Sequence, residues 1–262
     1  MQQTLAALDR IRAEGGVAIS GLIIVAPRGD LEFTRSENDR AVELTRASEG
    51  RFFALGSVHP GDGDAAIAEL ERIAGLGVPG LKLHPNTQGF DVASPEVERV
   101  VKRAAELGLV ILFDAYSPFD PGETGKFVRL AIAHPTARFI LAHMGGPRFF
   151  DMVVFGILKA YPNVYKRNVW LELSAVSHMV AGSPSLTEQL RHTCRLVGVD
   201  RVLFGSDYPV IAPAQAVADV RALGFEPEEE RSIFHDNAAA LFGLPGGASP
   251  VYGAARVELS HP

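Results

Sequence analysis

Short apolar runs alternate with helical patterns along almost the whole chain. Unbroken apolar runs are typical of parallel strands whose two faces are both covered. In the segments between them, apolar residues recur at helical spacing, as Val97, Val100, Val101 and Ala104 do at positions i, i+3, i+4 and i+7. We predict strands at 17–26, 51–59, 78–84, 109–114, 138–143, 169–174 and 201–207, and helices that include 2–13, 64–74, 96–107 and 185–196.

This alternation predicts an α/β fold, a (β/α)8 TIM-barrel-like arrangement of parallel strands. The 262 residues match the roughly 250 that such a barrel needs. The chain opens on the helix 2–13, so we expect the first strand of the barrel to be missing. A doubly wound open sheet is the alternative, but no glycine-rich phosphate turn follows the first predicted strand. We expect a single domain over 1–262, with an irregular tail at 245–262.

Charge and cysteine content narrow the classes of partner and compartment. A net charge of −6 and an isoelectric point near 5.8 predict no affinity for nucleic acid or anionic membranes. Cys194 is the single cysteine, which excludes an intramolecular disulfide and favours a cytoplasmic location. Segment 1–14 lacks the apolar stretch of a secretory signal, and no apolar run reaches the ~20 residues of a membrane span.

Four predicted strands end in charged or imidazole side chains, and this pattern is the main functional signal. These side chains are Lys82 with His84, Asp114, His143 and Asp207. Lys82 and His84 are two apart and therefore share a face of their strand. Strand ends meet at one mouth of a barrel, and imidazole and carboxylate suit zinc or manganese. A metal held there lowers the pKa of bound water toward ~7 and makes it a nucleophile.

Each of these residues also has a purely structural interpretation. Asp207 is suited to capping the next helix, Asp114 to accepting loop N–H groups, and His143 to a hydrogen-bonded place in the core. Lys82 could face solvent at its strand end. Taken together they favour a site, because several charges buried at one mouth are costly unless they pair or bind a metal. Glu172 lies inside the sixth predicted strand, one face of which is the barrel interior.

Four motifs carry a resemblance to a known family. They are Gly-x-Lys-x-His-Pro at 80–85, Ala-His-x-Gly-Gly at 142–146, Gly-Ser-Asp-Tyr-Pro at 205–209 and Asn-Ala-Ala-x-Leu-Phe-Gly-Leu at 237–244. In this order they resemble the amidohydrolase-related branch of the metal-dependent hydrolase superfamily, whose members include aminocarboxymuconate semialdehyde decarboxylase. The resemblance extends from about residue 5 to residue 244; each motif alone is weak, and the ordered set is specific.

The resemblance implies one divalent metal ion, zinc or manganese. By position, Asp207 corresponds to the ligand on strand eight that also accepts a proton, and His143 to the strand-six histidine that contacts or activates water. Asp114 stands where the family has a strand-five histidine. The His-x-His pair of the family's first strand has no counterpart in this sequence. The implied metal ligands are Asp207, His143 and Asp114, and the implied catalytic residues are Asp207 and His143.

The function that we expect first is hydrolysis of a small carboxylated or cyclic amide or ester, such as a lactone. A metal-bound hydroxide would attack the carbonyl while Asp207 and His143 manage the proton. We expect the substrate to be held by Lys82, His84, Arg148 and Tyr208.

Two alternatives stay open. The first is non-oxidative decarboxylation by the same family of sites, which releases CO2 and creates no new carboxylate. The second is a catalytically silent barrel that binds a small molecule or a partner, and the missing His-x-His favours it. A barrel of seven strands also has two unpaired edges, which makes a homo-oligomer possible.

Overall fold

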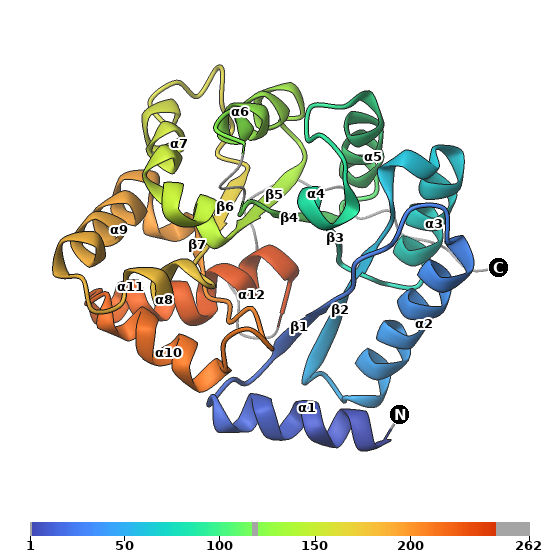
Figure 1. Cartoon of the computed structure of the whole chain (residues 1–262), viewed down its shortest axis with the longest axis horizontal. Coiled ribbons are helices and arrows are strands. Elements are labelled where there is room, and N and C mark those ends of the chain that lie inside the picture. Colours follow the sequence, from blue (N-terminus) through green and yellow to red (C-terminus); the bar gives the residue numbers. More distant parts are fainter. Residues whose placement is uncertain (1, 117–119, 245–262) are drawn as a thin grey trace.

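Seven parallel strands form one curved sheet in the order β1-β2-β3-β4-β5-β6-β7, with helices outside it (Figure 1). The computed structural model describes residues 2–116 and 120–244, so the predicted tail 245–262 lies outside the described residues. This architecture is the predicted TIM-barrel-like α/β fold, and the described residues supply seven strands of it. The strands are β1 (Ser20–Ile23), β2 (Phe52–Ser57), β3 (Gly80–Leu83), β4 (Val110–Asp114), β5 (Arg138–Ala142), β6 (Val169–Glu172) and β7 (Val202–Leu203).

Helices connect consecutive strands, as parallel pairing requires. The α-helices are α1 (Gln2–Glu14), α2 (Leu31–Ala47), α3 (Asp64–Gly75), α4 (Pro85–Gln88), α5 (Pro95–Glu106), α6 (Glu123–Ala133), α7 (Val153–Leu158), α8 (Val176–Val180), α9 (Pro184–Val197), α10 (Pro213–Ala222), α11 (Pro227–Arg231) and α12 (Asn237–Phe242). Four short segments of other helix types complete the set: η1 (Pro60–Asp62), η2 (His143–Met152), η3 (Val199–Arg201) and η4 (Ser232–Asp236).

The middle strands are buried on both faces. Their outward side chains, such as Leu81, Ile111 and Leu141, are fully buried and belong to the core beneath the surrounding helices. A second cluster is formed by the intervening side chains Val110, Ile140, Trp170 and Leu203, with Leu241 of α12. Figure 1 shows α12 inside the ring of outer helices, so this helix covers the lower interior of the sheet. The polar strand ends are thereby left at the opposite, carboxyl end.

The two edges of the sheet are much less complete than its middle. β1 pairs only with β2, and within residues 2–116 and 120–244 no pairing joins β1 to β7. Side chains along β1 are alternately half-buried and exposed, and α1 beside it contains no fully buried residue. Helix α1 contacts α10 and so spans the outside of this gap (Figure 1).

The edges also explain where the predicted strand lengths were wrong. The expected strand 17–26 is paired only over Ser20–Ile23, and the expected strand 201–207 only over Val202–Leu203. Both have a single neighbour in the sheet, so fewer ladder hydrogen bonds hold them extended. After β7 the Phe204 N–H donates to the carbonyl of Ile233 instead, at 3.1 Å.

Across the described ranges, none of the helices is both long enough and apolar enough to pass through a membrane.

Candidate active site

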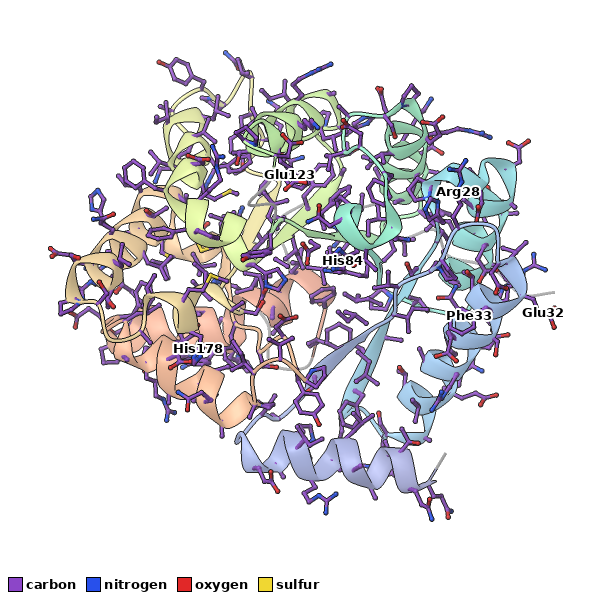
Figure 2. The ribbon with its side chains drawn as sticks, in the orientation of Figure 1. Arg28, Glu32, Phe33, His84, Glu123 and His178 are labelled. Atoms are coloured by element: carbon purple, nitrogen blue, oxygen red, sulfur yellow. The ribbon has the colours of Figure 1, made fainter. Side chains whose placement is uncertain are left out.

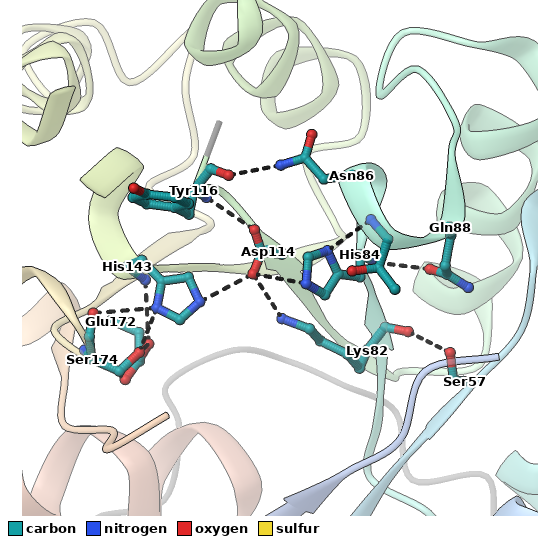
Figure 3. A network of polar contacts seen from close by, with 11 residues as sticks. Ser57, Lys82, His84, Asn86, Gln88, Asp114, Tyr116, His143, Glu172 and Ser174 are labelled. Atoms are coloured by element: carbon teal, nitrogen blue, oxygen red, sulfur yellow. Dashed lines mark hydrogen bonds and ion pairs between the residues drawn. The ribbon is translucent and has the colours of Figure 1, made fainter. Parts of the chain in front are cut away.

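The carboxyl ends of β3, β4 and β5 bring four of the predicted residues together (Figure 3). Lys82 lies in β3 opposite Leu112 of β4, two residues before Asp114. Asp114 is in turn opposite Ala142, the residue that precedes His143. His84 follows Lys82 by two residues, so both side chains reach the same side of the sheet. Strand register therefore assembles this cluster from segments about 30 residues apart in the chain.

The carboxylate of Asp114 is the centre of the cluster. Its Oδ2 atom lies 3.1 Å from His143 Nε2, 3.4 Å from His84 Nε2 and 3.8 Å from Lys82 Nζ. Its Oδ1 atom accepts a hydrogen bond from the backbone N–H of Tyr116 at 3.1 Å. One buried carboxylate thus holds three nitrogen-bearing side chains at the mouth of the barrel.

These contacts shift the pKa values of Asp114 and His143 toward their charged forms. Burial by itself would raise the pKa of Asp114, but the hydrogen bond from His143 and the charge of Lys82 outweigh it, so this pKa is lowered. Burial would lower the pKa of His143, but the hydrogen bond to Asp114 and the charge of Glu172 outweigh it, so this pKa is raised. Each of the two side chains therefore favours the charged form of the other.

The pKa values of Lys82 and His84 are shifted toward the neutral forms of these side chains. Burial lowers the pKa of the Lys82 ammonium, which is only 3% exposed, against the charges of Asp114 and Glu172. Burial also lowers the pKa of His84, against the charge of Asp114. The Nδ1 atom of His84 accepts from the Thr87 N–H at 3.4 Å, which leaves the ring hydrogen on Nε2, facing Asp114. His84 therefore acts as a neutral donor.

The Gly-Gly motif after β5 shapes the wall beside His143. His143, Met144, Gly145 and Gly146 all have positive φ angles, between 47° and 81°. This left-handed turn carries the chain from β5 into η2. A side chain at Gly146 would overlap the ring of Tyr116, so glycine permits the close approach of this segment to the loop after β4.

Two further polar residues, Glu172 and Ser174, complete the cluster at the end of β6 (Figure 3). The Oγ atom of Ser174 lies 2.8 Å from His143 Nδ1, and its hydroxyl donates to Glu172 Oε2. Ser174 was missed in the sequence, although it ends the predicted strand 169–174. The signal was the spacing: Glu172 and Ser174 are two apart, like Lys82 and His84.

The other two residues predicted to hold substrate, Arg148 and Tyr208, lie in the segments that follow β5 and β7. The side chain of Arg148 forms an ion pair with Asp151 at 3.0 Å and donates to the Pro121 carbonyl at 3.3 Å. Tyr208 is half-exposed in the loop after β7. The charge of Asp207 adds to the raising of the pKa of His143 and opposes the lowering of the pKa values of Lys82 and His84, so Asp207 is within electrostatic range of the cluster.

His59 and His178 make their hydrogen bonds outside this cluster. His59 is buried; its Nδ1 accepts from the Gly61 N–H at 3.0 Å, so Nε2 donates to the Gln88 carbonyl at 2.7 Å. His178 pairs with Asp219 at 2.8 Å. Figure 2 shows His84 near the middle of the molecule, whereas His178 lies over α8 and α10 at its periphery.

The predicted metal ligands do not fit a divalent ion in this arrangement. His143 Nε2 and Asp114 Oδ2, the two atoms that would bind the ion, are hydrogen-bonded to each other. The Lys82 ammonium lies beside the same Asp114 oxygen. In the part of the chain that the structure describes, no three His, Cys, Asp or Glu side chains are grouped so that they could hold a metal ion. The cluster acts here as a network of hydrogen bonds and charges.

Comparison with known proteins gives the family. The chain is 23% identical over 255 residues to 2-amino-3-carboxymuconate-6-semialdehyde decarboxylase of Dictyostelium discoideum, covering 83% of this chain and 68% of that protein. It resembles the structure of 2,6-dihydroxybenzoate decarboxylase from Rhizobium, with a TM-score of 0.71, 20% identity, and coverage of 91% and 88% of the two chains. It also resembles manganese-bound 5-carboxyvanillate decarboxylase from Novosphingobium aromaticivorans, with a TM-score of 0.68, 20% identity, and coverage of 91% and 80%. The amidohydrolase family model matches residues 29–244, and the chain therefore belongs to the amidohydrolase family.

Proposed function

We propose that this protein catalyses non-oxidative decarboxylation of a small carboxylic acid that carries a hydroxyl or enol next to its carboxylate. The observation that carries the proposal is the buried cluster of Lys82, His84 and His143 around Asp114. The relatives named above support it, because they are decarboxylases of small unsaturated or aromatic acids. Decarboxylation thereby replaces hydrolysis as the first candidate.

Lys82 and His84 are the residues that we assign to substrate binding. A buried ammonium requires a negative partner, and Asp114 lies 3.8 Å from it, beyond direct hydrogen-bond distance. An incoming carboxylate or ionised hydroxyl would provide a second anionic partner for Lys82. The neutral His84, a quarter of whose side chain is exposed, would donate to the same group from the open side of the mouth.

His143 is the residue that we assign to proton transfer. In the reaction the bond between the substrate carbon and its carboxylate breaks, and CO2 leaves without the electron pair. That pair stays on the carbon, which takes a proton from His143 Nε2. Asp114 favours the imidazolium that supplies this proton, and solvent returns a proton after product release. Net consumption is one proton for each CO2 formed.

Metal binding at this site is a separate property that can be measured. Manganese is bound in the Novosphingobium relative, and a divalent ion, zinc or manganese, is the cofactor that the family implies. Asp114 Oδ2 and His143 Nε2, two atoms that would bind such an ion, are hydrogen-bonded to each other. We expect protein dialysed against metal-free buffer to retain far less than one equivalent of metal per chain by elemental analysis. Near-stoichiometric metal, lost on Asp207→Asn, would instead restore the ligand set implied by the family.

The proposal is tested by following the carboxyl carbon. The protein is incubated in D2O with 13C-carboxyl-labelled 2,6-dihydroxybenzoate, 5-carboxyvanillate or 2-amino-3-carboxymuconate-6-semialdehyde. We expect labelled CO2 together with a product that carries deuterium at the vacated carbon. Acid release from lactones or amides in a pH-stat, without CO2, would establish hydrolysis instead. If neither reaction occurs, a silent barrel becomes the better interpretation.

A matched pair of lysine variants separates the site from general effects. Lys82→Met removes the buried ammonium, and Lys102→Met removes an exposed lysine of α5. We expect Lys82→Met to lower kcat/KM by at least about 100-fold, the usual cost of removing a positioned charge from an active site. Lys102→Met should leave it unchanged. Equal effects of the two substitutions would contradict the assignment of Lys82.

A further inference from the structure

Glu172 and Ser174 form a buried pair that the proposed reaction does not yet use. Glu172 is 8% exposed and Ser174 is 3% exposed. Glu172 Oε1 accepts from the Ser174 backbone N–H at 2.9 Å, and Glu172 Oε2 accepts from the Ser174 hydroxyl. On the neighbouring segment, Gly205 lies so close to the Glu172 carboxylate that any side chain there would overlap it. The carboxylate is therefore fixed by packing as well as by hydrogen bonds.

The direction of these hydrogen bonds determines what Ser174 can offer to His143. A serine hydroxyl has one hydrogen, and here it is donated to Glu172. Ser174 Oγ, 2.8 Å from His143 Nδ1, is therefore left as an acceptor. The Ser174 carbonyl, 3.2 Å from the same nitrogen, is also an acceptor. Both partners of Nδ1 require it to carry a hydrogen.

We propose that Glu172, acting through Ser174, keeps a hydrogen on His143 Nδ1 and so reserves Nε2 as the atom that exchanges a proton with substrate. Ser174 and Glu172 are positioning residues, since neither touches the reacting atoms. In the imidazolium both ring nitrogens carry a hydrogen, and Nε2 donates to Asp114 Oδ2 at 3.1 Å. Once Nε2 has given its hydrogen to substrate, the two acceptors at Nδ1, against the single one at Nε2, keep the remaining hydrogen on Nδ1. This inference rests on the proposed function for its catalytic consequence, whereas the location of the hydrogen can be measured without any substrate.

Glu172→Gln is the sharpest test because it reverses the network with little change in shape. Both carboxylate oxygens accept from a backbone N–H: Oε1 from Ser174 at 2.9 Å and Oε2 from His143 at 3.4 Å. The shorter contact keeps the amide oxygen of the variant at the Oε1 position, so the new amide nitrogen takes the Oε2 position beside Ser174 Oγ. That nitrogen is a donor. Ser174 Oγ then accepts from it and donates its own hydrogen to His143 Nδ1. The neutral ring is thereby driven to carry its hydrogen on Nε2.

Ring-nitrogen NMR of the whole protein labelled with 15N-histidine measures this directly. The His143 signals are assigned by their loss in His143→Gln, and spectra are compared at a pH where this ring is neutral. We expect the Nδ1–H form in the wild type and the Nε2–H form in Glu172→Gln. An Nε2–H wild type, or an unchanged Nδ1–H form in Glu172→Gln, would overturn the proposal whether or not the protein decarboxylates any acid.

Serine variants supply the kinetic test on whichever acid is decarboxylated. Ser174→Ala should lower kcat by about 10- to 100-fold with little change in KM. Removing the hydrogen-bond partner of the second ring nitrogen has this effect at histidines that bind a metal. Ser174→Thr keeps the hydroxyl and should restore most of kcat. Ser48→Ala is the matched control, because Ser48 is equally buried and hydrogen-bonded but lies at the end of α2. A Ser174→Thr variant as slow as Ser174→Ala would contradict the hydroxyl's role.

Discussion

The middle of the sheet and its open edge both consist of apolar strands, but they differ in strand pairing and in burial. β3, β4 and β5 each have two neighbouring strands, and almost all of their side chains are buried. β1 has one neighbour, and Ile23 at its end is 48% exposed. The apolar composition of a strand is therefore not enough to bury it. Burial depends on the strand's neighbours, and the proposed chemistry lies where both neighbours exist.

This difference also separates what each region can do. Asp114, His143 and Lys82 are held in one geometry because the strands that carry them are paired on both sides. A site that needs sub-ångström positions gains from such a rigid frame. Within the described residues, the edges of β1 and β7 that face the gap between them have no strand partner, and such edges are suited to pairing with another chain. We expect activity to depend on the middle and association to depend on the edge.

The largest expected contrast is in thiol reactivity. Cys194 of α9 is fully buried, and burial raises the pKa of its thiol to about 12, so at pH 8 it is a thiol rather than the reactive thiolate. We expect Cys194 to react with a thiol reagent at least about 1,000-fold more slowly than Ile23→Cys in a Cys194→Ala background, because local opening at an edge costs far less than global unfolding. Both should react at similar rates in urea. Similar rates in the native protein would mean that the edge is as well protected as the core.

Phe113→Ala should cause the largest loss of stability. Phe113 lies in β4, is fully buried, and packs its ring 5.3 Å from that of Phe127. Removing it leaves a cavity in the rigid middle, which typically lowers the free energy of unfolding by about 3–5 kcal/mol. Urea denaturation measures the change, with Phe33→Ala on the exposed start of α2 as control. A loss below about 1 kcal/mol would show that the middle rearranges easily and is not rigid.

Asp114→Asn should affect activity more than stability. The amide keeps the shape but removes the charge that raises the pKa of His143. We expect kcat to fall by about 100- to 1,000-fold, comparable with loss of one strong electrostatic contact in an active site. Initial rates of CO2 release measure the effect, and Asp62→Asn, at the end of η1, is the control. Retention of more than a tenth of the wild-type rate would remove Asp114 from the centre of the mechanism.

Ile23→Lys should have the smallest effect on folding. The side chain is half-exposed, so the free energy of unfolding should change by no more than about 0.5 kcal/mol. A charge on an edge strand opposes pairing with another edge. If the wild type self-associates through β1, size-exclusion chromatography should show a shift of Ile23→Lys toward the monomer. An unchanged elution volume for an oligomeric wild type would assign the interface to another surface.

The sequence by itself determined the order of elements and the polar ends of the strands. Continuous apolar runs alternating with helical spacing fix a parallel α/β sheet, because only parallel strands covered by helices bury both faces. The placement of Lys82, His84, Asp114 and His143 at one end then follows from topology, and the structure gathers these four. The edge strands were predicted too long, because a single sequence does not show that a neighbour is missing.

Only the tertiary structure decided how the site residues are used. Asp114 and His143 are predicted to share a metal ion, and in the structure their side chains lie 3.1 Å apart and are hydrogen-bonded to each other. Arg148, which is predicted to hold substrate, forms an ion pair with Asp151. Ser174 gains its importance from a hydrogen bond across 31 residues of chain. Such choices depend on the curvature of the sheet and on the left-handed turn after β5, which set distances between strands to within an ångström. Local sequence patterns fix which face a side chain takes, but not which of several nearby partners it reaches.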